Sequence, residues 1–430
     1  MKLKPPALLR KRKLRNLIAV GVAFAGLSSI ALAQTTPAMA DPTETLVAVG
    51  SDTIQDVWNQ FATHLGGNFV GSYNATNPTT NTTGEDITPA DGTASVNCAF
   101  VRPNGSGAGI AALKYSLGDH STAVVNALTP ALNTSHVDLP GAGCVDIARS
   151  SSNPGSNGNY AGTDAIQYIP FALDAVTGAT GPATSQSGDT FTVNGTTVSP
   201  VATTITDADE FTVANLTTLY HDCQPVTLPD GTTYWPKNGV AAQPAGSKVI
   251  DLYVPQAGSG TRNFWGQQLG NFPTGAGALP QCVFDTIQGG PVTGVAVEEH
   301  DGTAVSTDPN GYGPFSIAQW ISQRGGHNDR RHDAVIHSLA TDTLNPPTEV
   351  SPFSNGNPAT GTLNTSFPIT RQVFNVVSQA RILNANDPLH SLLVGSTSQV
   401  CNDKSDILSY GFALIGSSCG QVIQANAVKI

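Results

Sequence analysis

Charged residues are scarce in this sequence: they make up 12% of its 430 residues, and aromatic residues make up 7%. No GxxxxGK[ST] segment is present, which excludes a P-loop nucleoside triphosphatase. The cysteines form no CxxC pair and do not cluster with histidines, which argues against a zinc site. The four tryptophans are too scattered along the chain to indicate a platform for stacking carbohydrates.

Basic residues are few after the first fifteen positions. Seven of the 20 lysines and arginines lie in residues 1–15, whereas all 31 acidic residues lie beyond residue 40. The chain from residue 41 onward therefore carries a formal charge of −18. Such a surface repels nucleic acid and anionic membranes at long range, so neither is expected as a partner.

The N-terminus has the three parts of a secretory signal peptide. Residues 1–15 are basic, residues 17–32 are apolar, and the small-residue run Ala38-Met39-Ala40 follows. A membrane anchor is the alternative, but two glycines and two serines interrupt the apolar run, which is shorter than the ~20 residues that a spanning helix needs. We expect cleavage near Ala40 and a secreted chain that begins near Asp41 without a lipid-modified cysteine.

An exported chain meets an oxidising environment, where an even number of cysteines favours disulfides. Six cysteines allow fifteen pairings, and the sequence does not choose among them. We expect sequential pairing, because each disulfide then closes a loop within one region. The expected pairs are Cys98 with Cys144, Cys223 with Cys282, and Cys401 with Cys419.

Short apolar runs alternate with segments of helical periodicity along the expected mature chain, which indicates an α/β architecture. With 39% hydrophobic residues, the chain has enough apolar material for a large core. Expected strands cover residues 45–49, 167–172 and 249–254, expected helices cover 54–65, 216–220 and 317–323, and 177–204 is expected to hold an inserted hairpin.

Turns rich in glycine, serine and threonine recur after the expected strands, and two of them clearly open helices. The first turn of a helix has free backbone N–H groups and a partial positive charge, which together suit an oxyanion. An acidic protein can hold such an anion if one arginine adds a charge-assisted hydrogen bond. Arg149 is the best-placed arginine and Arg262 the second candidate. Each turn taken alone could instead be an ordinary helix cap.

Ser259 offers an alternative, catalytic interpretation. It lies in Ala257-Gly258-Ser259-Gly260-Thr261, which departs from the G-x-S-x-G nucleophile elbow at the first position. A nucleophilic serine also needs a base, and no local signature marks one among His64, His221, His300 and His337. A secreted hydrolase of esters or phosphoesters is therefore kept as a second hypothesis.

The segment from Val254 to Phe264, with its Ser259-Gly260-Thr261 core, resembles the SGT…F signature of the phosphate-type substrate-binding proteins of ABC transporters. The chain looks like a secreted, actinobacterial-like member, and the resemblance covers most of residues 45–415. Supporting segments follow in the order of that family: residues 50–53, 105–109, 145–151, 170–176, 308–318 and 367–371.

The resemblance implies a fold, which is the type II periplasmic-binding-protein fold: two α/β lobes, each discontinuous in sequence, around a central cleft. After a signal peptide of residues 1–40, lobe 1 would comprise residues 41–170 and 370–430, and lobe 2 residues 171–369. Closure about the crossover segments near Pro170 and Pro368 would trap the ligand.

The resemblance also implies a set of residues that line the anion site: Ser51, Thr53, Ser106, Gly107, Arg149, Ser151, Ser259, Gly260 and Thr261. Two positions depart from the family. Pro255 stands where the family has an arginine, so Arg149 is expected to supply the cation. Ser151 stands where the family has an aspartate that accepts a proton from phosphate and thereby selects against sulfate. Asp52 could restore that acceptor, although a helix cap is its simpler role.

Together these features predict a secreted, monomeric, non-catalytic protein that binds inorganic phosphate or a related oxyanion. The resemblance makes an ABC permease its membrane partner, although the sequence carries no readable docking signature. No cofactor or metal is expected. A third hypothesis is a surface protein that keeps the fold without a ligand, suggested by the two departures and by the absent lipid anchor.

Overall fold

The computed structural model describes residues 46–66, 69–78, 83–89, 98–128, 139–152, 154 and 165–424. The expected signal peptide lies outside these residues, so it stays a prediction. Within the described part, no helix has the length and apolar character needed to cross a bilayer.

The described part of the chain alternates strands and helices, as the sequence predicted. The strands are β1 (Leu46–Gly50), β2 (Val70–Ser72), β3 (Asp86–Ile87), β4 (Phe100–Val101), β5 (Ile147–Ser150), β6 (Ile166–Thr180), β7 (Phe191–Val193), β8 (Thr196–Val198), β9 (Val226–Thr227), β10 (Thr233–Pro236), β11 (Lys248–Tyr253), β12 (Val283–Phe284), β13 (Gly311–Ser316), β14 (Val335–Ile336), β15 (Leu339–Ala340), β16 (Glu349–Val350), β17 (Thr370–Ser378) and β18 (Ile423–Gln424). The α-helices are α1 (Gln55–His64), α2 (Gly105–Ser116), α3 (Thr122–Leu128), α4 (Val213–Tyr220), α5 (Gly260–Gln268), α6 (Thr303–Thr307), α7 (Ile317–Arg324), α8 (Gln379–Leu383), α9 (Pro388–Leu393), α10 (Gln399–Asn402) and α11 (Lys404–Ser409), and the 3₁₀ turns are η1 (Asp52–Ile54), η4 (Ala208–Glu210) and η5 (Gly416–Ser418).

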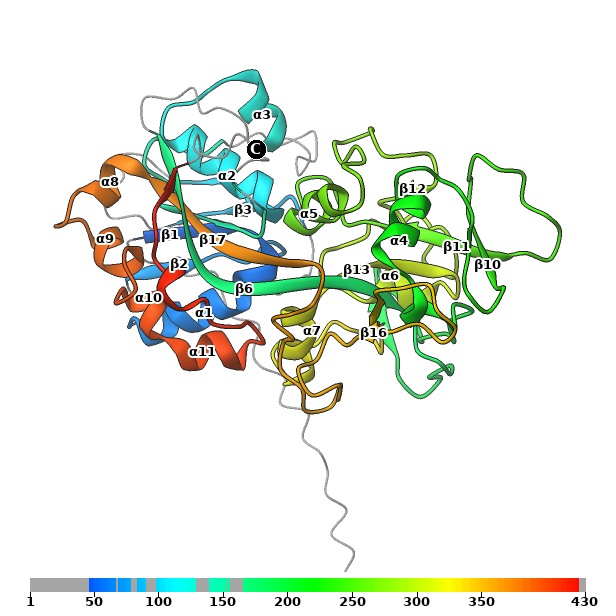
Figure 1. Cartoon of the computed structure of the whole chain (residues 1–430). Coiled ribbons are helices and arrows are strands. Elements are labelled where there is room, and N and C mark those ends of the chain that lie inside the picture. The colour runs from blue at the N-terminus through cyan, green and yellow to red at the C-terminus, as the bar shows by residue number, and fades with distance from the viewer. Residues whose placement is uncertain are drawn as a thin grey trace, which may run out of the picture. The chain divides into compact units, whose positions relative to one another are not determined.

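One mixed sheet organises the molecule (Figure 1). Its strand order among the described residues is β2-β1-β5-β17-β6-β13-β11-β10-β9, with β12 beside β11, and β14 and β18 beside β6. Strands β2, β1 and β5 are parallel to one another, and we call them the β1 group. Strands β13, β11 and β10 are likewise parallel and form the β11 group. The fold class is therefore α/β with a central mixed sheet.

The two groups are joined by the long strands β6 and β17, which run antiparallel across the middle of the sheet (Figure 1). The first part of β6 pairs with β17 from Ile166 to Ala175, and its last part pairs with β13 from Val176 to Ala179. The crossover segment expected at 170–176 is thus the centre of a single 15-residue strand.

The buried apolar side chains fall into three clusters that follow this division. One cluster draws on residues between Ala175 and Ile369, around the β11 group. The other two draw on residues up to Ala172 and from Val373 onward, with Ala318 added, around the β1 group. The described residues nevertheless form one compact unit, and the lobe boundaries at 170 and 370 stay a prediction.

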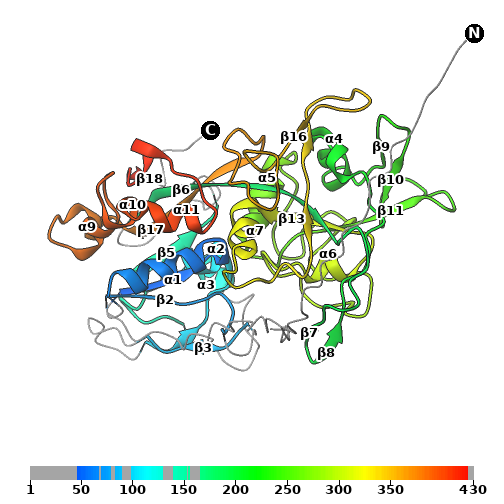
Figure 2. The same ribbon diagram turned by 90° about the horizontal axis from the view of Figure 1, so that it is seen from below.

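The expected insertion at 177–204 contains the hairpin of β7 and β8, which projects from the body of the molecule in Figure 2. Its turn residues Asn194 and Gly195 have φ values of 47° and 80°. Positive φ at both central positions is typical of a type I′ turn, whose twist matches that of the flanking strands.

Three disulfides join Cys98 to Cys144, Cys223 to Cys282, and Cys401 to Cys419. This is the sequential pairing that we expected from the sequence. The first and third disulfides lie in the clusters around the β1 group, and the second lies in the cluster around the β11 group.

The second and third disulfides allow a test of how loop length affects stability. Replacing Cys223 and Cys282 together by alanine frees a loop of 59 residues and is expected to lower the free energy of unfolding by about 4 kcal/mol. The Cys401→Ala/Cys419→Ala variant frees 18 residues and should lose about 3 kcal/mol. Urea unfolding followed by tryptophan fluorescence measures both losses, and a larger loss for the shorter loop would contradict this ranking.

Candidate functional site

A cluster of serine and threonine hydroxyls brings three of the predicted turns together. The hydroxyl oxygen of Ser151, just after β5, lies 3.1 Å from those of Ser51 and Thr53 and 3.3 Å from that of Ser106. The backbone N–H of Ser151 also donates to Ser106 Oγ, at 3.0 Å. All four side chains are fully buried. Side chains from η1, α2 and the end of β5 therefore meet at one point.

The fourth turn, between β11 and α5, packs directly on this cluster. The N–H of Gly107 donates to the carbonyl oxygen of Gly258 at 2.9 Å. A Cβ atom on Gly260 would lie 2.3 Å from the hydroxyl oxygens of both Ser106 and Ser151. Gly260 is thus a position where the absence of a side chain permits the close approach.

Ser259 does not present its hydroxyl as a nucleophile would. Its Oγ accepts a hydrogen bond from the backbone N–H of Arg262 at 3.0 Å and thereby caps the N-terminus of α5. Among the hydrogen bonds of the described residues, none joins Ser259 to a histidine. The arrangement favours the cap over the catalytic interpretation.

A carboxylate that the sequence analysis did not single out lies between the turns. Oε1 of the fully buried Glu299 accepts from the hydroxyls of Thr53 and Thr261, at 2.6 and 2.5 Å. It also lies 3.3 Å from the backbone N of Thr261 and 3.0 Å from Nε2 of His300. Burial opposes ionisation, but the hydrogen bond from His300 and the charge of Arg371 contribute to lowering the pKa of Glu299 well below its usual value.

His300 is held in a strained backbone conformation beside this carboxylate. Its φ is 56°, in the left-handed region that non-glycine residues rarely adopt. Its Nδ1 accepts from the N–H of Ser316 at 3.4 Å, so Nε2 carries the proton and faces Thr53 Oγ1 at 2.8 Å and Glu299. Gln323 fixes the residue further by donating to its carbonyl oxygen at 2.9 Å. Such strain is typical of functional sites.

Asp52 adds a second carboxyl group to the site. Burial raises its pKa well above the usual value, and the charge of Glu299 and a hydrogen bond to it raise the pKa further. Burial and the neighbouring charge of Glu299 therefore both favour the protonated form of Asp52.

Two groups in the described part of the chain have the spacing of a metal site. One consists of Asp52, Glu299 and His300, and the other of His64, Asp403 and Asp406, which are less buried. In the first group, Oε1 of Glu299 and Nε2 of His300 already have protein partners, as described above. In the second, Nδ1 of His64 pairs with both carboxylates, at 3.2 and 2.8 Å.

The guanidinium that reaches the hydroxyl cluster belongs to Arg371. It donates to Thr261 Oγ1 at 2.8 Å and to the carbonyl oxygen of Ser151 at 3.2 Å. Its Nε and a second nitrogen also donate to Oδ2 of Asp174, at 3.0 and 2.9 Å. Arg371 on β17 and Asp174 on β6 are direct cross-strand partners, so the sheet register fixes this buried ion pair.

Arg149, the arginine expected to meet the anion, is turned toward the backbone. It donates to Ser72 Oγ at 2.6 Å and to the carbonyl oxygens of Gly50 and Tyr73. Burial lowers its pKa to about 9. Arg149 thus connects the end of β1, at Gly50, to the end of β2 and the residue after it. Arg262 likewise donates to three carbonyl oxygens and to Asp285.

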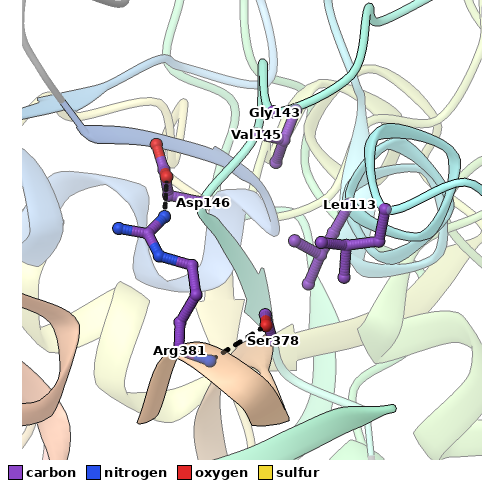
Figure 3. Close-up of a pocket in the computed structure, with 7 residues that line it drawn as sticks. Leu113, Gly143, Val145, Asp146, Ser378 and Arg381 are labelled. Atoms are coloured by element: carbon purple, nitrogen blue, oxygen red, sulfur yellow. Dashed lines mark hydrogen bonds and ion pairs between the residues drawn. The ribbon is translucent and has the colours of Figure 1, made fainter. Parts of the chain in front are cut away.

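A separate pocket of about 340 Å³ lies at the start of α8 (Figure 3). Apolar side chains of Leu113 and Val145 form part of its wall, and Arg381 is the cation within it. Because Arg381 donates to the carboxylates of Asp146 and Asp387, its charge is already compensated. None of the described residues that line this pocket therefore supplies the free cation that an anion site requires.

The sequence analysis did not assign Asp174, Glu299, His300 and Arg371 to the anion site, although it considered His300 among the candidate bases. One signal could have drawn attention to two of them: Glu298-Glu299-His300-Asp301 is a dense run of titratable residues in a chain with only 12% charged residues. Asp174 and Arg371 carry no such local mark, since their pairing depends on strand register.

No family model matches this chain, and no curated protein is detectably similar to it in sequence. The similar solved structures include a possible phosphate binding protein from Planctomyces limnophilus DSM 3776, with 13% identity over 88% of this chain and 95% of that chain, at a TM-score of 0.34. They also include a phosphate binding protein from Stenotrophomonas maltophilia, with 14% identity over 87% and 92% of the two chains, at a TM-score of 0.35.

The close approach at Gly260 can be tested by adding one methyl group. Gly260→Ala should lower the free energy of unfolding by about 1–3 kcal/mol, because the new methyl overlaps the hydroxyls of Ser106 and Ser151. Gly188→Ala is the control, since nothing lies within 4 Å of a Cβ there. Chemical denaturation compares the two variants, and equal stabilities would show that the α5 turn is packed less tightly than described.

The raised pKa of Asp52 predicts a pH dependence of stability. A carboxyl group with a raised folded-state pKa stabilises the fold fully below its unfolded pKa, and this contribution is lost as pH rises through the folded pKa. In Asp52→Asn the amide keeps a donor and does not titrate. Its stability relative to the wild type should therefore increase as pH rises above the ordinary pKa of an aspartate, about 4. Denaturation at increasing pH measures the trend, with the exposed Asp189→Asn as the control; a constant difference would contradict it.

Proposed function

We propose that this chain is an exported, non-catalytic solute-binding protein that captures an oxyanion, inorganic phosphate, where the four turns meet. The observation that carries the proposal is the set of donors around Oε1 of Glu299. Two hydroxyls, a backbone N–H and an imidazole N–H, from residues far apart in sequence, point at one anionic oxygen. The carboxylate oxygen stands in for an oxygen of the solute.

The chemistry of these donors suits a tetrahedral oxyanion. The N-terminus of α5 contributes a partial positive charge and the N–H of Thr261, which bonds Glu299, and the N-terminus of α2 lies against it through the contact between Gly107 and Gly258. Arg371 adds a cationic hydrogen-bond donor at Thr261. In place of the carboxylate that Ser151 lacks, the carboxyl group of Asp52 would select phosphate over sulfate once it is ionised, because only the ionised form accepts the proton of phosphate and repels sulfate. Displacement of Glu299 by the solute would remove one of the negative charges that raise the pKa of Asp52.

The two expected lobes give this site its opening. Thr53 and Ser106 lie on the side of the β1 group, whereas Thr261 and Glu299 lie on the side of the β11 group. Solute would enter when the sides separate about β6 and β17, and closure would exclude water and strengthen each hydrogen bond. The three disulfides suit an oxidising compartment, and delivery to an ABC permease would follow capture.

One observation favours a second candidate, a protein of this fold that binds no solute. The donors that would hold an anion are already occupied by Glu299. If this carboxylate were a permanent part of the core, the same contacts would serve only to hold the two sides together. The two candidates differ in whether an added anion can take the place of the carboxylate.

Calorimetric titration of the mature chain with phosphate, arsenate and sulfate tests the proposal. We expect one phosphate per chain, similar binding of arsenate, and much weaker binding of sulfate. Arg371→Lys keeps the charge but loses the branched donor, and should weaken phosphate binding at least about tenfold. Lys404→Ala, an exposed change, is the control and should leave binding unaltered. The absence of binding for every anion, in both the wild type and Glu299→Gln, would refute the proposed function.

A further inference from the structure

We infer that Glu299 is a built-in competitor for the solute: its carboxylate holds the site closed when no solute is present, and the solute binds by displacing it. This inference rests on the proposed function and deepens it. It concerns what limits the affinity of the site, which the identity of the solute alone does not determine.

The first step is the crowding of donors around one carboxylate oxygen. Oε1 of Glu299 has four donors within 3.3 Å, from Thr53, Thr261 and His300. An oxygen with two lone pairs does not satisfy four donors equally. The donors thus exceed what a single carboxylate oxygen needs, and an anion with more oxygens would distribute them better.

The second step is that Glu299 bonds the threonine hydroxyls of the site but not its serine hydroxyls. The carboxylate engages the two threonines, whereas the hydroxyls of Ser51 and Ser106 contact Ser151 Oγ, at 3.1 and 3.3 Å. Thr53 Oγ1 also lies 3.1 Å from Ser151 Oγ. A carboxylate is planar and offers two oxygens. A tetrahedral anion offers four, so it can engage the threonines and the serines together. This difference gives the solute the advantage it needs to displace Glu299.

The third step is the position of Glu299 between the two sides. Through Thr53 the carboxylate joins the segment before α6 to the turn after β1, residues separated by 246 positions in sequence. Neighbouring contacts act in the same place: Gln319 donates to the carbonyl oxygen of Thr53 at 2.6 Å, and Asn104 donates to Glu298 at 3.2 Å. A closed arrangement therefore has its own hydrogen bonds without any solute.

A competitor of this kind reduces the apparent affinity by the fraction of molecules in which the carboxylate is displaced. If Glu299 occupies the donors in about 99% of molecules, the apparent Kd for the solute is raised about a hundredfold. The protein would then retain solute only at concentrations above a threshold that Glu299 sets, and would release it more readily.

Phosphate titrations of three variants at pH 8 test this inference. Glu299→Gln removes the charge with little change in shape, and Glu299→Asp keeps the charge but withdraws the carboxylate by one methylene group. Glu349→Gln is the control, because it makes the same substitution at an exposed position on β16. We expect the Kd for phosphate to fall at least tenfold in Glu299→Gln and about threefold or more in Glu299→Asp. The Kd of Glu349→Gln should stay within about threefold of the wild type.

Solution scattering gives a second measurement that does not depend on affinity. Without phosphate, Glu299→Gln should have a larger radius of gyration than the wild type and should become compact when phosphate is added. The wild type should change less, because Glu299 already holds it closed. An unchanged or higher Kd in both Glu299 variants, or an equal effect of Glu349→Gln, would overturn the inference. Binding of phosphate by all variants with equal Kd would leave the proposed function standing, whereas no binding by any of them would refute both.

Discussion

The hydrogen bonds to Oε1 of Glu299 are the constraint on which the rest of the site depends. A buried charge is costly unless donors surround it, so the carboxylate draws Thr53, Thr261 and His300 to one point. Each donor belongs to a different structural context: the turn after β1, the start of α5, and a strained residue before α6. Removing any one of them would leave a buried anion less well paired, which links the positions of otherwise independent loops.

The ion pair between Arg371 and Asp174 fixes the position of the cation that lies next to the hydroxyl cluster. Because both residues lie on the long strands β6 and β17, the sheet sets their separation, and the pair places a guanidinium beneath Thr261 and Ser151. Asp174 also accepts from Ser316 Oγ and from the N–H of Ala318 at the start of α7. The charge of Arg371 is thus balanced by a carboxylate on β6, the strand that connects the β1 group and the β11 group.

Local patterns in the sequence predicted the α/β class, the turns and the disulfide pairing, since these depend on periodicity, glycine content and loop length. The turns at Ser51, Ser106, Ser151 and Ser259 were identified from their own residues, and they meet. Arg149 was a reasonable choice because it stands beside Ser151, but local sequence does not tell where a guanidinium points. Glu299 joins the first turn through Thr53, and Arg371 joins the turn before α5 through Thr261; both pairings span more than 100 positions, which no local pattern encodes. Their contact with a solute stays a prediction.

The continuity of β6 has a further consequence for the molecule as a whole. A single strand supplies backbone hydrogen bonds first to β17 and then to β13, so no flexible linker of irregular chain separates the two sides along this path. The proposed opening and closing of the two sides would be absorbed as twist and bend within the paired strands, which defines the direction of the motion. The same pairing couples the unfolding of the two sides. Loss of β6 from the sheet would remove a hydrogen-bonded partner from both β17 and β13.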